Sequence, residues 1–207
     1  MSSNSTSSSS ISTKAKLTSK DLIIIGIFSA IYMLVCVAIS GIVITPILQL
    51  LMTPLIALLT GPIYFLYIAK TQKPFCILIT GLLFSVLVGL LVYGNVICFV
   101  LNFTCFVAAE IAAYIGKYKN FKLNMLSYTF ASFSALVEAA LFWYMPDFIY
   151  NLALETGYSQ SWVDGVVALT TPTNLALVIA GVIVCAIISS LASRSILKKH
   201  FKKAGII

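Results

Sequence analysis

Two glutamates are the residues of this 207-residue chain that could do chemistry within its long apolar stretches. Glu110 and Glu138 are the ionisable residues that lie well inside such stretches. A charge there is costly, so a functional role is the first hypothesis for both. Small and polar residues lead up to Glu138 at spacings of three and four, which places them on one helix face. They are Asn124, Ser127, Ala131, Ser134 and Glu138. We expect this face to contact protein.

Glu138 is the predicted centre of a substrate-binding pocket. Aromatic and acidic residues follow it closely in the sequence, and two asparagines share a helix face in the preceding apolar stretch. The predicted substrate-binding residues are Glu138, Asn102, Trp143, Tyr144, Asp147 and Asn95. The alternative is a structural role, in which a protonated Glu138 and the amide of Asn102 form hydrogen bonds between helices.

Glu110 has a more structural interpretation. It lies in an alanine-rich run at residues 108–113, which would let another helix approach closely. Lys117 lies two turns further along the same face. We therefore interpret Glu110 as half of an ion pair with Lys117, and a functional role is the alternative.

The rest of the chemical inventory argues against an enzyme. The single histidine, His200, lies in a basic C-terminal stretch, which excludes His-based catalysis and metal sites. The five cysteines fall in apolar stretches without C-x-x-C spacing, which favours packing roles. No G-x-x-x-x-G-K-S/T motif occurs, so the chain has no P-loop ATPase site of its own. We predict no catalytic residue, no metal site and no cofactor.

Composition places the chain in a membrane. Apolar residues make up 60% of it and charged residues 9%, whereas a soluble domain carries about 25% charged residues. The net charge of +7 would suggest a nucleic-acid partner, but the basic residues gather in four clusters between long apolar stretches. These clusters lie at residues 14–20, 70–73, 117–122 and 194–203. Because cytoplasmic loops of membrane proteins collect Lys and Arg, the charge indicates topology and no nucleic acid.

Each gap between basic clusters can hold two membrane spans, since a helix needs about 20 residues to cross the bilayer. The predicted spans are residues 22–39, 46–69, 74–92, 95–116, 123–145 and 172–192. The predicted fold is an all-α membrane protein, a six-transmembrane-helix bundle with both termini in the cytoplasm. Its parts are a disordered Ser-rich tail (1–20), the membrane domain (21–193) and a basic C-terminal tail (194–207).

Residues 146–171 form a long external segment between the fifth and sixth predicted spans. It contains acidic residues and no basic residue. Two short amphipathic helices are predicted there, the first capped by Asp147 and stopped at Gly157, the second beginning at Ser161. Thr171 is the predicted N-cap of the last span. We expect the two short helices to lie over the outer mouth of the bundle.

Small residues at four-residue spacing occur on three predicted spans and indicate close helix contacts. They are Gly26 and Ala30 on the first span, Gly81, Ser85 and Gly89 on the third, and Gly181, Cys185, Ser189 and Ser193 on the sixth. Within one chain such faces mostly pack against neighbouring helices. One that is turned to lipid would suit a partner helix.

Several stretches together resemble a known family. They are residues 16–32 (KLTSKDLIIIGIFSAIY), 61–64 (GPIY), 162–164 (WVD), 169–172 (LTTP) and 198–206 (KKHFKKAGI). On these stretches the chain resembles the Trep/Strep-type integral membrane proteins, a group of substrate-capture (S) components of energy-coupling factor (ECF) transporters. The resemblance covers nearly the whole chain after the Ser-rich tail.

The resemblance implies a component of a bacterial ABC importer that binds a vitamin-like or other scarce nutrient at the outer face of the plasma membrane. Its partners would be a transmembrane coupling subunit and two cytoplasmic ATPases, and the loaded body would topple to face inward. Gly26 and Ala30 would contact the coupling subunit. The external loops would act as a gate, with Tyr158 and Trp162 as gating residues.

The substrate and one alternative function stay open at this point. Haem is one candidate, because the external segment is rich in aromatic residues. The lack of an external histidine and the external acidic residues favour a cationic or neutral vitamin precursor. The alternative function is a stand-alone secondary transporter, driven by an ion gradient through Glu138 and Glu110. An intramembrane enzyme or a scaffold has little support from the residues.

Overall fold

The computed structural model describes residues 17–201, and the regular structure in that range is helical throughout. The helices are α1 (Ser19–Ser40), α2 (Pro46–Leu59), α3 (Gly61–Thr71), α4 (Cys76–Ser85), the π-helical η1 (Val86–Val92), α5 (Val96–Ile115), α6 (Phe121–Ala139), α7 (Leu141–Tyr144), α8 (Pro146–Glu155), α9 (Gln160–Ala168), α10 (Pro172–Ile196) and the π-helical η2 (Leu197–Phe201). The predicted tails at 1–20 and 194–207 lie partly outside the described residues. Inside them, α1 has begun by Ser19 and the helical chain continues to Phe201.

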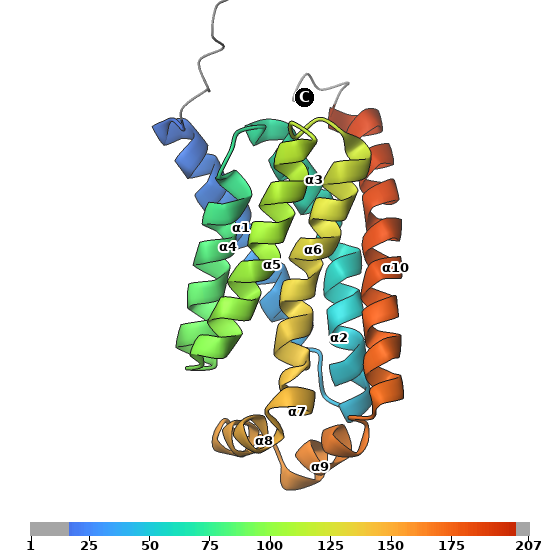
Figure 1. Ribbon diagram of the computed structural model, residues 1–207. Helices are drawn as coiled ribbons and strands as arrows, with labels where there is room; N and C mark the ends of the chain where they lie inside the picture. Colours follow the sequence, from blue (N-terminus) through green and yellow to red (C-terminus); the bar gives the residue numbers. More distant parts are fainter. Residues whose placement is uncertain (1–16, 202–207) are drawn as a thin grey trace, which may run out of the picture.

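The long helices run side by side, and the short helices α7, α8 and α9 lie across one end of the bundle (Figure 1). We call the end with α7, α8 and α9 the cap end, at the bottom of Figure 1. The opposite end, where the described chain begins and finishes, is the terminal end. The basic α3–α4 and α5–α6 connections also lie at the terminal end, so these two connections and the acidic segment 146–171 are separated along the bundle.

Within residues 17–201, four helical segments are long and apolar enough to cross a membrane. They are Ser19–Ser40, Pro46–Thr71, Val96–Ile115 and Pro172–Lys199. The third predicted span corresponds to the shorter apolar segment Cys76–Val92, and the fifth begins with the 19-residue α6, whose sequence is more polar. The all-helical membrane fold is confirmed, whereas the count of six spans and the cytoplasmic termini stay predictions.

The polar sequence of α6 is explained by its neighbours. α6 packs against α2, α3, α5 and α10, and its polar side chains are turned into these contacts. Ser127 and Ser134 are fully buried, as is Ala131 between them. The Ser127 hydroxyl donates a hydrogen bond to the Ala109 carbonyl of α5 at 2.6 Å. The small and polar face that leads to Glu138 contacts protein, as predicted.

The second predicted span is broken at Thr60, and a proline explains the break. Pro62 has no N–H to donate to the Leu58 carbonyl four residues earlier. Ser189 of α10 supplies a donor instead, with its hydroxyl oxygen 2.6 Å from that carbonyl oxygen. Gly61 permits this approach, because a Cβ atom there would overlap the Ser189 side chain. The GPIY stretch therefore fixes where α10 packs against α2 and α3.

The cap end contains the two short helices expected in segment 146–171, but their starts differ from the prediction. α8 begins at Pro146, whose fixed φ suits the first helical position, so Asp147 lies in the first turn and does not cap the helix. α9 begins at Gln160, and its N-cap is Ser159 in place of Ser161. The Ser159 hydroxyl accepts the Trp162 N–H, the bond that defines a capping residue.

The predicted helix ends on either side of these starts are confirmed. Gly157 follows the last turn of α8 with φ +97°, a left-handed conformation that glycine adopts without strain. Thr171 caps α10, since its hydroxyl accepts the Asn174 N–H at 3.2 Å. These ends depend on short-range geometry, which is why local sequence signals predict them.

The three small-residue stripes have different surroundings. A Cβ atom at Gly81 would overlap the Phe106 side chain, so α4 lies tight against α5. On α10, Ser189 faces α2 and α3 through the hydrogen bond described above. Gly26 on α1 is unlike these, because no heavy atom lies within 4 Å of a Cβ built there. Ala30, one turn later, is also exposed.

Candidate functional site

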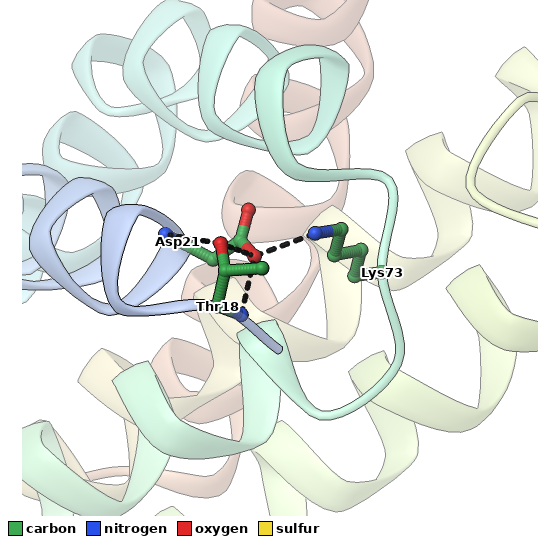
Figure 2. A network of polar contacts seen from close by, with 3 residues as sticks. All are labelled: Thr18, Asp21 and Lys73. Carbon is green, nitrogen blue, oxygen red and sulfur yellow. Dashed lines mark hydrogen bonds and ion pairs between the residues drawn. The ribbon is translucent and has the colours of Figure 1, made fainter. Parts of the chain in front are cut away.

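An ion pair at the terminal end joins the start of α1 to the α3–α4 connection (Figure 2). Lys73 Nζ lies 2.6 Å from Asp21 Oδ2, and the same oxygen accepts the Thr18 N–H at 2.7 Å and its hydroxyl at 2.6 Å. The Thr18 hydroxyl in turn accepts the Asp21 backbone N–H, which completes a capping box. Sequence reasoning missed this network, although Thr18-x-x-Asp21 before an apolar run was the available signal.

Glu110 holds the start of α4 from the neighbouring helix α5. Its Oε1 accepts the Phe75 N–H at 2.8 Å. Its Oε2 accepts the Ile77 and Leu78 N–H groups at 3.1 and 3.3 Å. The Tyr118 hydroxyl donates to Oε1 as well. The first N–H groups of a helix have no partner within it, and α4 has no capping side chain of its own. Glu110 satisfies them.

The predicted ion pair between Glu110 and Lys117 is wrong. α5 ends at Ile115, and Lys117 has a left-handed φ of +49°, so it leaves the helix face that its spacing implied. The donors that Glu110 binds are backbone N–H groups and a phenol. The role of Glu110 is structural, as expected, but it acts as a cap across helices and not as an ion-pair partner.

Glu138 lies in the last turn of α6, near the cap end. Its Oε1 atom is buried and has no hydrogen-bond partner among the described residues. Its carboxyl lies within electrostatic range of groups on four other segments. They are Tyr32 and Cys36 of α1, Tyr93 before α5, Cys98 of α5 and Tyr144 of α7. No Lys or Arg occurs between residues 123 and 193. The Oε1 atom of Glu138 is therefore a buried acceptor that receives no hydrogen bond among the described residues.

The two predicted asparagines differ in how they are used. Asn102 is fully buried on α5, its amide donates to Cys98 Sγ at 3.6 Å, and its Oδ1 has no partner. Asn95 caps α5, since its Oδ1 accepts the Ile97 and Cys98 N–H groups at 2.9 and 3.1 Å. The Asn95 amide lies 3.4 Å from Met145 Sδ. The Asn95 side chain is used to cap α5, whereas Asn102 Oδ1 is a buried acceptor without a hydrogen bond.

The three predicted residues that follow Glu138 lie in separate surroundings. The Trp143 indole N–H donates to the Thr171 carbonyl at 3.0 Å, which ties α7 to the start of α10. The Tyr144 hydroxyl donates to the Val137 carbonyl at 3.2 Å and is within electrostatic range of Glu138. Asp147 is exposed in the first turn of α8. Tyr144 is therefore placed beside the candidate site, and Asp147 lies on the surface of the cap.

The predicted gating residues Tyr158 and Trp162 pack on each other, with ring centroids 4.3 Å apart. Tyr158 is exposed, whereas the Trp162 indole N–H is buried and has no partner. Trp162 packs against two apolar clusters, one that contains Cys98 and one that contains Ile39. Tyr158 and Trp162 therefore lie where α9 packs against the helical bundle.

One hydrogen bond joins the two cap helices. The Tyr150 hydroxyl of α8 donates to Asp164 Oδ1 of α9 at 2.9 Å. The Asp164 carboxylate raises the pKa of Tyr150, because the bond requires the protonated phenol. α9 in turn lies against the start of α2, since a Cβ atom at Gly165 would overlap Pro46. The cap is held to the bundle through α9.

Tyr32 is a site residue that sequence reasoning missed. The side chain is 5% exposed, yet its hydroxyl has no hydrogen-bond partner within the described structure. It is within electrostatic range of Glu138 of α6 and of Cys36 of its own helix. The available signal was the three- and four-residue spacing of Ser29, Tyr32 and Cys36, which gives α1 a polar edge.

A small cavity lies inside the bundle and adjoins this site at Tyr32. Its walls are mostly apolar and aromatic. The lining residues are Phe28, Tyr32, Ile63, Tyr64, Tyr67, Thr80 and Phe106. None of the predicted substrate-binding residues, Glu138 included, lines this cavity.

The candidate site offers hydrogen-bonding groups. Within residues 17–201, no three His, Cys, Asp or Glu side chains gather in a way that could hold a metal ion. All five cysteines are free thiols.

The long apolar helices, with polar groups buried between them, define an integral membrane protein. The chain belongs to the Trep_Strep family, described as hypothetical bacterial integral membrane proteins, whose model matches residues 19–203. No curated protein and no solved structure matches the chain. The family named by the resemblance is confirmed, and the membrane location with it. The link to ECF transporters stays a proposal.

Proposed function

We propose that this protein is the substrate-capture (S) component of an ECF-type importer. In this role it binds a small nutrient beneath the cap end, which faces outward. A coupling subunit and two cytoplasmic ATPases then act on the loaded protein, which topples to release the nutrient inside. The observation that carries the proposal is the open small-residue face of α1.

α1 has an exposed face of small residues that no other part of the described chain covers. Gly26 and Ala30 lie on its exposed face, flanked by Ile23 and Ile27, which are 63% and 53% exposed. The equivalent stripes on α4 and α10 are occupied by helices of this chain. Small residues let two helix backbones approach closely. A transmembrane helix of the coupling subunit would fit against Gly26 and Ala30.

The energy for import would come from the partners. The sequence has no P-loop, so nucleotide hydrolysis requires other chains. The basic connections lie together at the terminal end (Figure 1), and cytoplasmic loops collect such residues. This arrangement supports a terminal end that faces the ATPases and a cap end that faces the substrate.

The charge at the cap end supports a cationic or neutral nutrient over haem. Asp147, Glu155 and Asp164 are exposed there, and they would repel the haem propionates. The single histidine, His200, belongs to η2 at the opposite end of the bundle. An axial histidine ligand for haem iron is therefore missing from the cap.

Co-purification tests the assembly. The protein is expressed with a coupling subunit and its two ATPases, and the complex is isolated through a tag on one ATPase. Gly26→Leu should lower recovery of this chain about tenfold, because the added side chain would keep the partner helix from approaching α1 closely. Ala180→Leu, at an exposed position of α10, is the matched control and should leave recovery unchanged. Equal recovery of both variants, or no recovery of the natural chain, would contradict the proposal.

A proton-coupled secondary transporter is the second candidate, and the unpartnered carboxyl oxygen of Glu138 is the observation that favours it. Glu110 no longer supports it, because backbone N–H groups and Tyr118 already occupy that carboxylate. Vesicles that contain this chain alone and a trapped pH-sensitive dye decide between the two. Proton flux that Glu138→Gln abolishes would favour the secondary transporter, whereas no flux would favour the S component.

A further inference from the structure

Seven buried side-chain polar atoms have no hydrogen-bond partner within residues 17–201, and three of them are Thr53 Oγ1, Ser85 Oγ and Asn124 Oδ1. The other four belong to residues on four different helices. They are the Tyr32 hydroxyl of α1, Asn102 Oδ1 of α5, Glu138 Oε1 of α6 and the Trp162 indole N–H of α9. Buried polar groups in proteins are nearly always hydrogen-bonded, and each exception has a cost. Four exceptions from four helices point to a missing partner.

These atoms belong to one neighbourhood. The carboxyl of Glu138 is within electrostatic range of Tyr32 and of Cys98. Asn102 lies one turn from Cys98 on α5 and is hydrogen-bonded to its sulfur. Trp162 packs against the cluster that contains Cys98 and against a second cluster, on which Cys36 also packs. The four groups are thus linked through Glu138, Cys98 and the clusters on which Trp162 packs.

The chemistry of the four groups defines what they would bind. Glu138 and Asn102 present oxygen acceptors, so they require N–H or O–H donors on the ligand. The Trp162 indole is a donor only, and the Tyr32 hydroxyl can donate as well. No Lys or Arg occurs between residues 74 and 116 or between 123 and 193. An anionic ligand would find no basic side chain on α5 or α9, and on α6 only Lys122, at the terminal end of that helix.

We propose that this site binds a small organic amine or amidinium, a nitrogen compound whose N–H groups donate to Glu138 and Asn102. Tyr32 and Trp162 complete the site by donating to an acceptor atom, or to the π face, of the same molecule. The proposal rests on the proposed function for its location beneath the cap, and it names the substrate class of that site. It adds Tyr32 as a ligand-binding residue and gives Trp162 a direct contact.

Three probes with the same phenyl ring and different head groups separate the possible chemistries. Benzamidinium has a charge and N–H donors, phenyltrimethylammonium has a charge without donors, and benzoate has the opposite charge. Each is titrated against the full chain in phosphatidylcholine nanodiscs, with intrinsic tryptophan fluorescence as the readout. Benzamidinium should bind saturably and at least about tenfold more tightly than either of the others, as expected for a charge-assisted hydrogen bond.

Variants then assign the binding to this site. Glu138→Gln should weaken benzamidinium binding about tenfold or more, and Tyr32→Phe severalfold. Glu155→Gln removes an exposed carboxylate of the same cap and should leave the affinity unchanged. Because Glu138→Gln and Tyr32→Phe test two different helices, a folding defect in one variant leaves the other as a test.

The outcomes separate this inference from the proposed function. Equal affinity for benzoate, no saturable response to benzamidinium, or unchanged binding by Glu138→Gln and Tyr32→Phe would overturn the amine site. Glu138→Gln should still co-purify with the coupling subunit and ATPases, because Gly26 and Ala30 are untouched. Loss of binding in Glu138→Gln, together with no co-purification of the natural chain, would retain the site and reject the S component.

Discussion

The carboxyl groups of Glu110 and Glu138 lie in the same helical bundle but differ in their hydrogen bonding. Glu110, toward the terminal end of α5, accepts bonds from three backbone N–H groups and one phenol and closes the start of α4. Glu138, in the last turn of α6, has a buried oxygen without a partner and four other segments around it. Both residues lie in apolar stretches, and both began with the same functional hypothesis.

The difference shows what an intramembrane glutamate needs before a function is assigned to it. A carboxylate whose lone pairs are occupied by backbone donors stabilises the fold and has little capacity left for a ligand. A buried acceptor without a donor lowers stability until something binds it. A fold-stabilising glutamate is therefore distinguished from a ligand-binding one by the hydrogen bonds that its carboxyl group accepts. The depth of the residue in the membrane does not distinguish them. Substitutions at both ends of the bundle test this contrast.

Glu110→Ala should have the largest effect on stability. It leaves the Phe75, Ile77 and Leu78 N–H groups at the start of α4 without their acceptor. We expect a loss of about 3 kcal/mol in the free energy of unfolding, or about 6–12 °C in the unfolding temperature. Thermal unfolding in detergent, followed by circular dichroism, measures it. A shift no larger than that of the exposed control Glu155→Ala would remove Glu110 from the fold-stabilising role.

Asp21→Asn should have the next largest effect, again at the terminal end. It removes the charge that pairs with Lys73 and weakens the capping box with Thr18 (Figure 2). The Lys73 and Asp21 side chains are 23% and 11% exposed, so we expect the unfolding temperature to fall by a few degrees. Lys73→Met should give a smaller decrease, and the double variant should lose less than the sum of the two. Additive losses would show that the two side chains do not interact in solution.

Tyr150→Phe should have a small effect that depends on pH. The hydrogen bond to Asp164 raises the pKa of Tyr150 above its usual value of 10.0. Since the folded-state pKa is raised, the stabilisation is fully present below pH 10 and is lost as pH rises through the folded value. The unfolding temperatures of the natural chain and the variant should therefore differ slightly at pH 8 and converge in strong alkali. A difference that persists there would indicate lost packing instead.

Glu138→Gln should have the smallest effect on stability, although its effect on ligand binding is large. Its buried oxygen has no partner to lose, and the amide has nearly the same shape. We expect the unfolding temperature to change by no more than about 1 °C in the absence of ligand. A decrease as large as that of Glu110→Ala would mean that Glu138 is also bonded within the fold, and the contrast between the two glutamates would disappear.

Local signals in the sequence predicted much of the architecture. The first four predicted spans begin and end within a few residues of helix ends, whereas the fifth covers both α6 and α7, and the helical segment of the last continues beyond residue 192. Gly157 and Thr171 end and begin helices as expected. These features depend on hydrophobic runs and on bonds within four residues. The break at Thr60 depends on a neighbour, because α10 supplies the donor that Pro62 cannot.

The partners of polar residues were much harder to predict. Lys117 has the right spacing to pair with Glu110, yet the helix ends before it and donors from the distant 75–78 segment take its place. Asn95 has the right type for a ligand but caps its own helix. Tyr32 of α1 comes within electrostatic range of Glu138 of α6 only through the folding of the bundle.

By itself, the amino-acid sequence determined that this chain is a helical membrane protein of the Trep_Strep family, with its basic clusters separated from an acidic segment. Hydrophobicity and charge are sums over residues, so they need no knowledge of neighbours. Only the tertiary structure decided that Glu110 is bonded, that Glu138 is not, and that Gly26 faces away from the bundle. Whether a polar atom is satisfied depends on donors from distant segments, which only folding brings within about 3 Å.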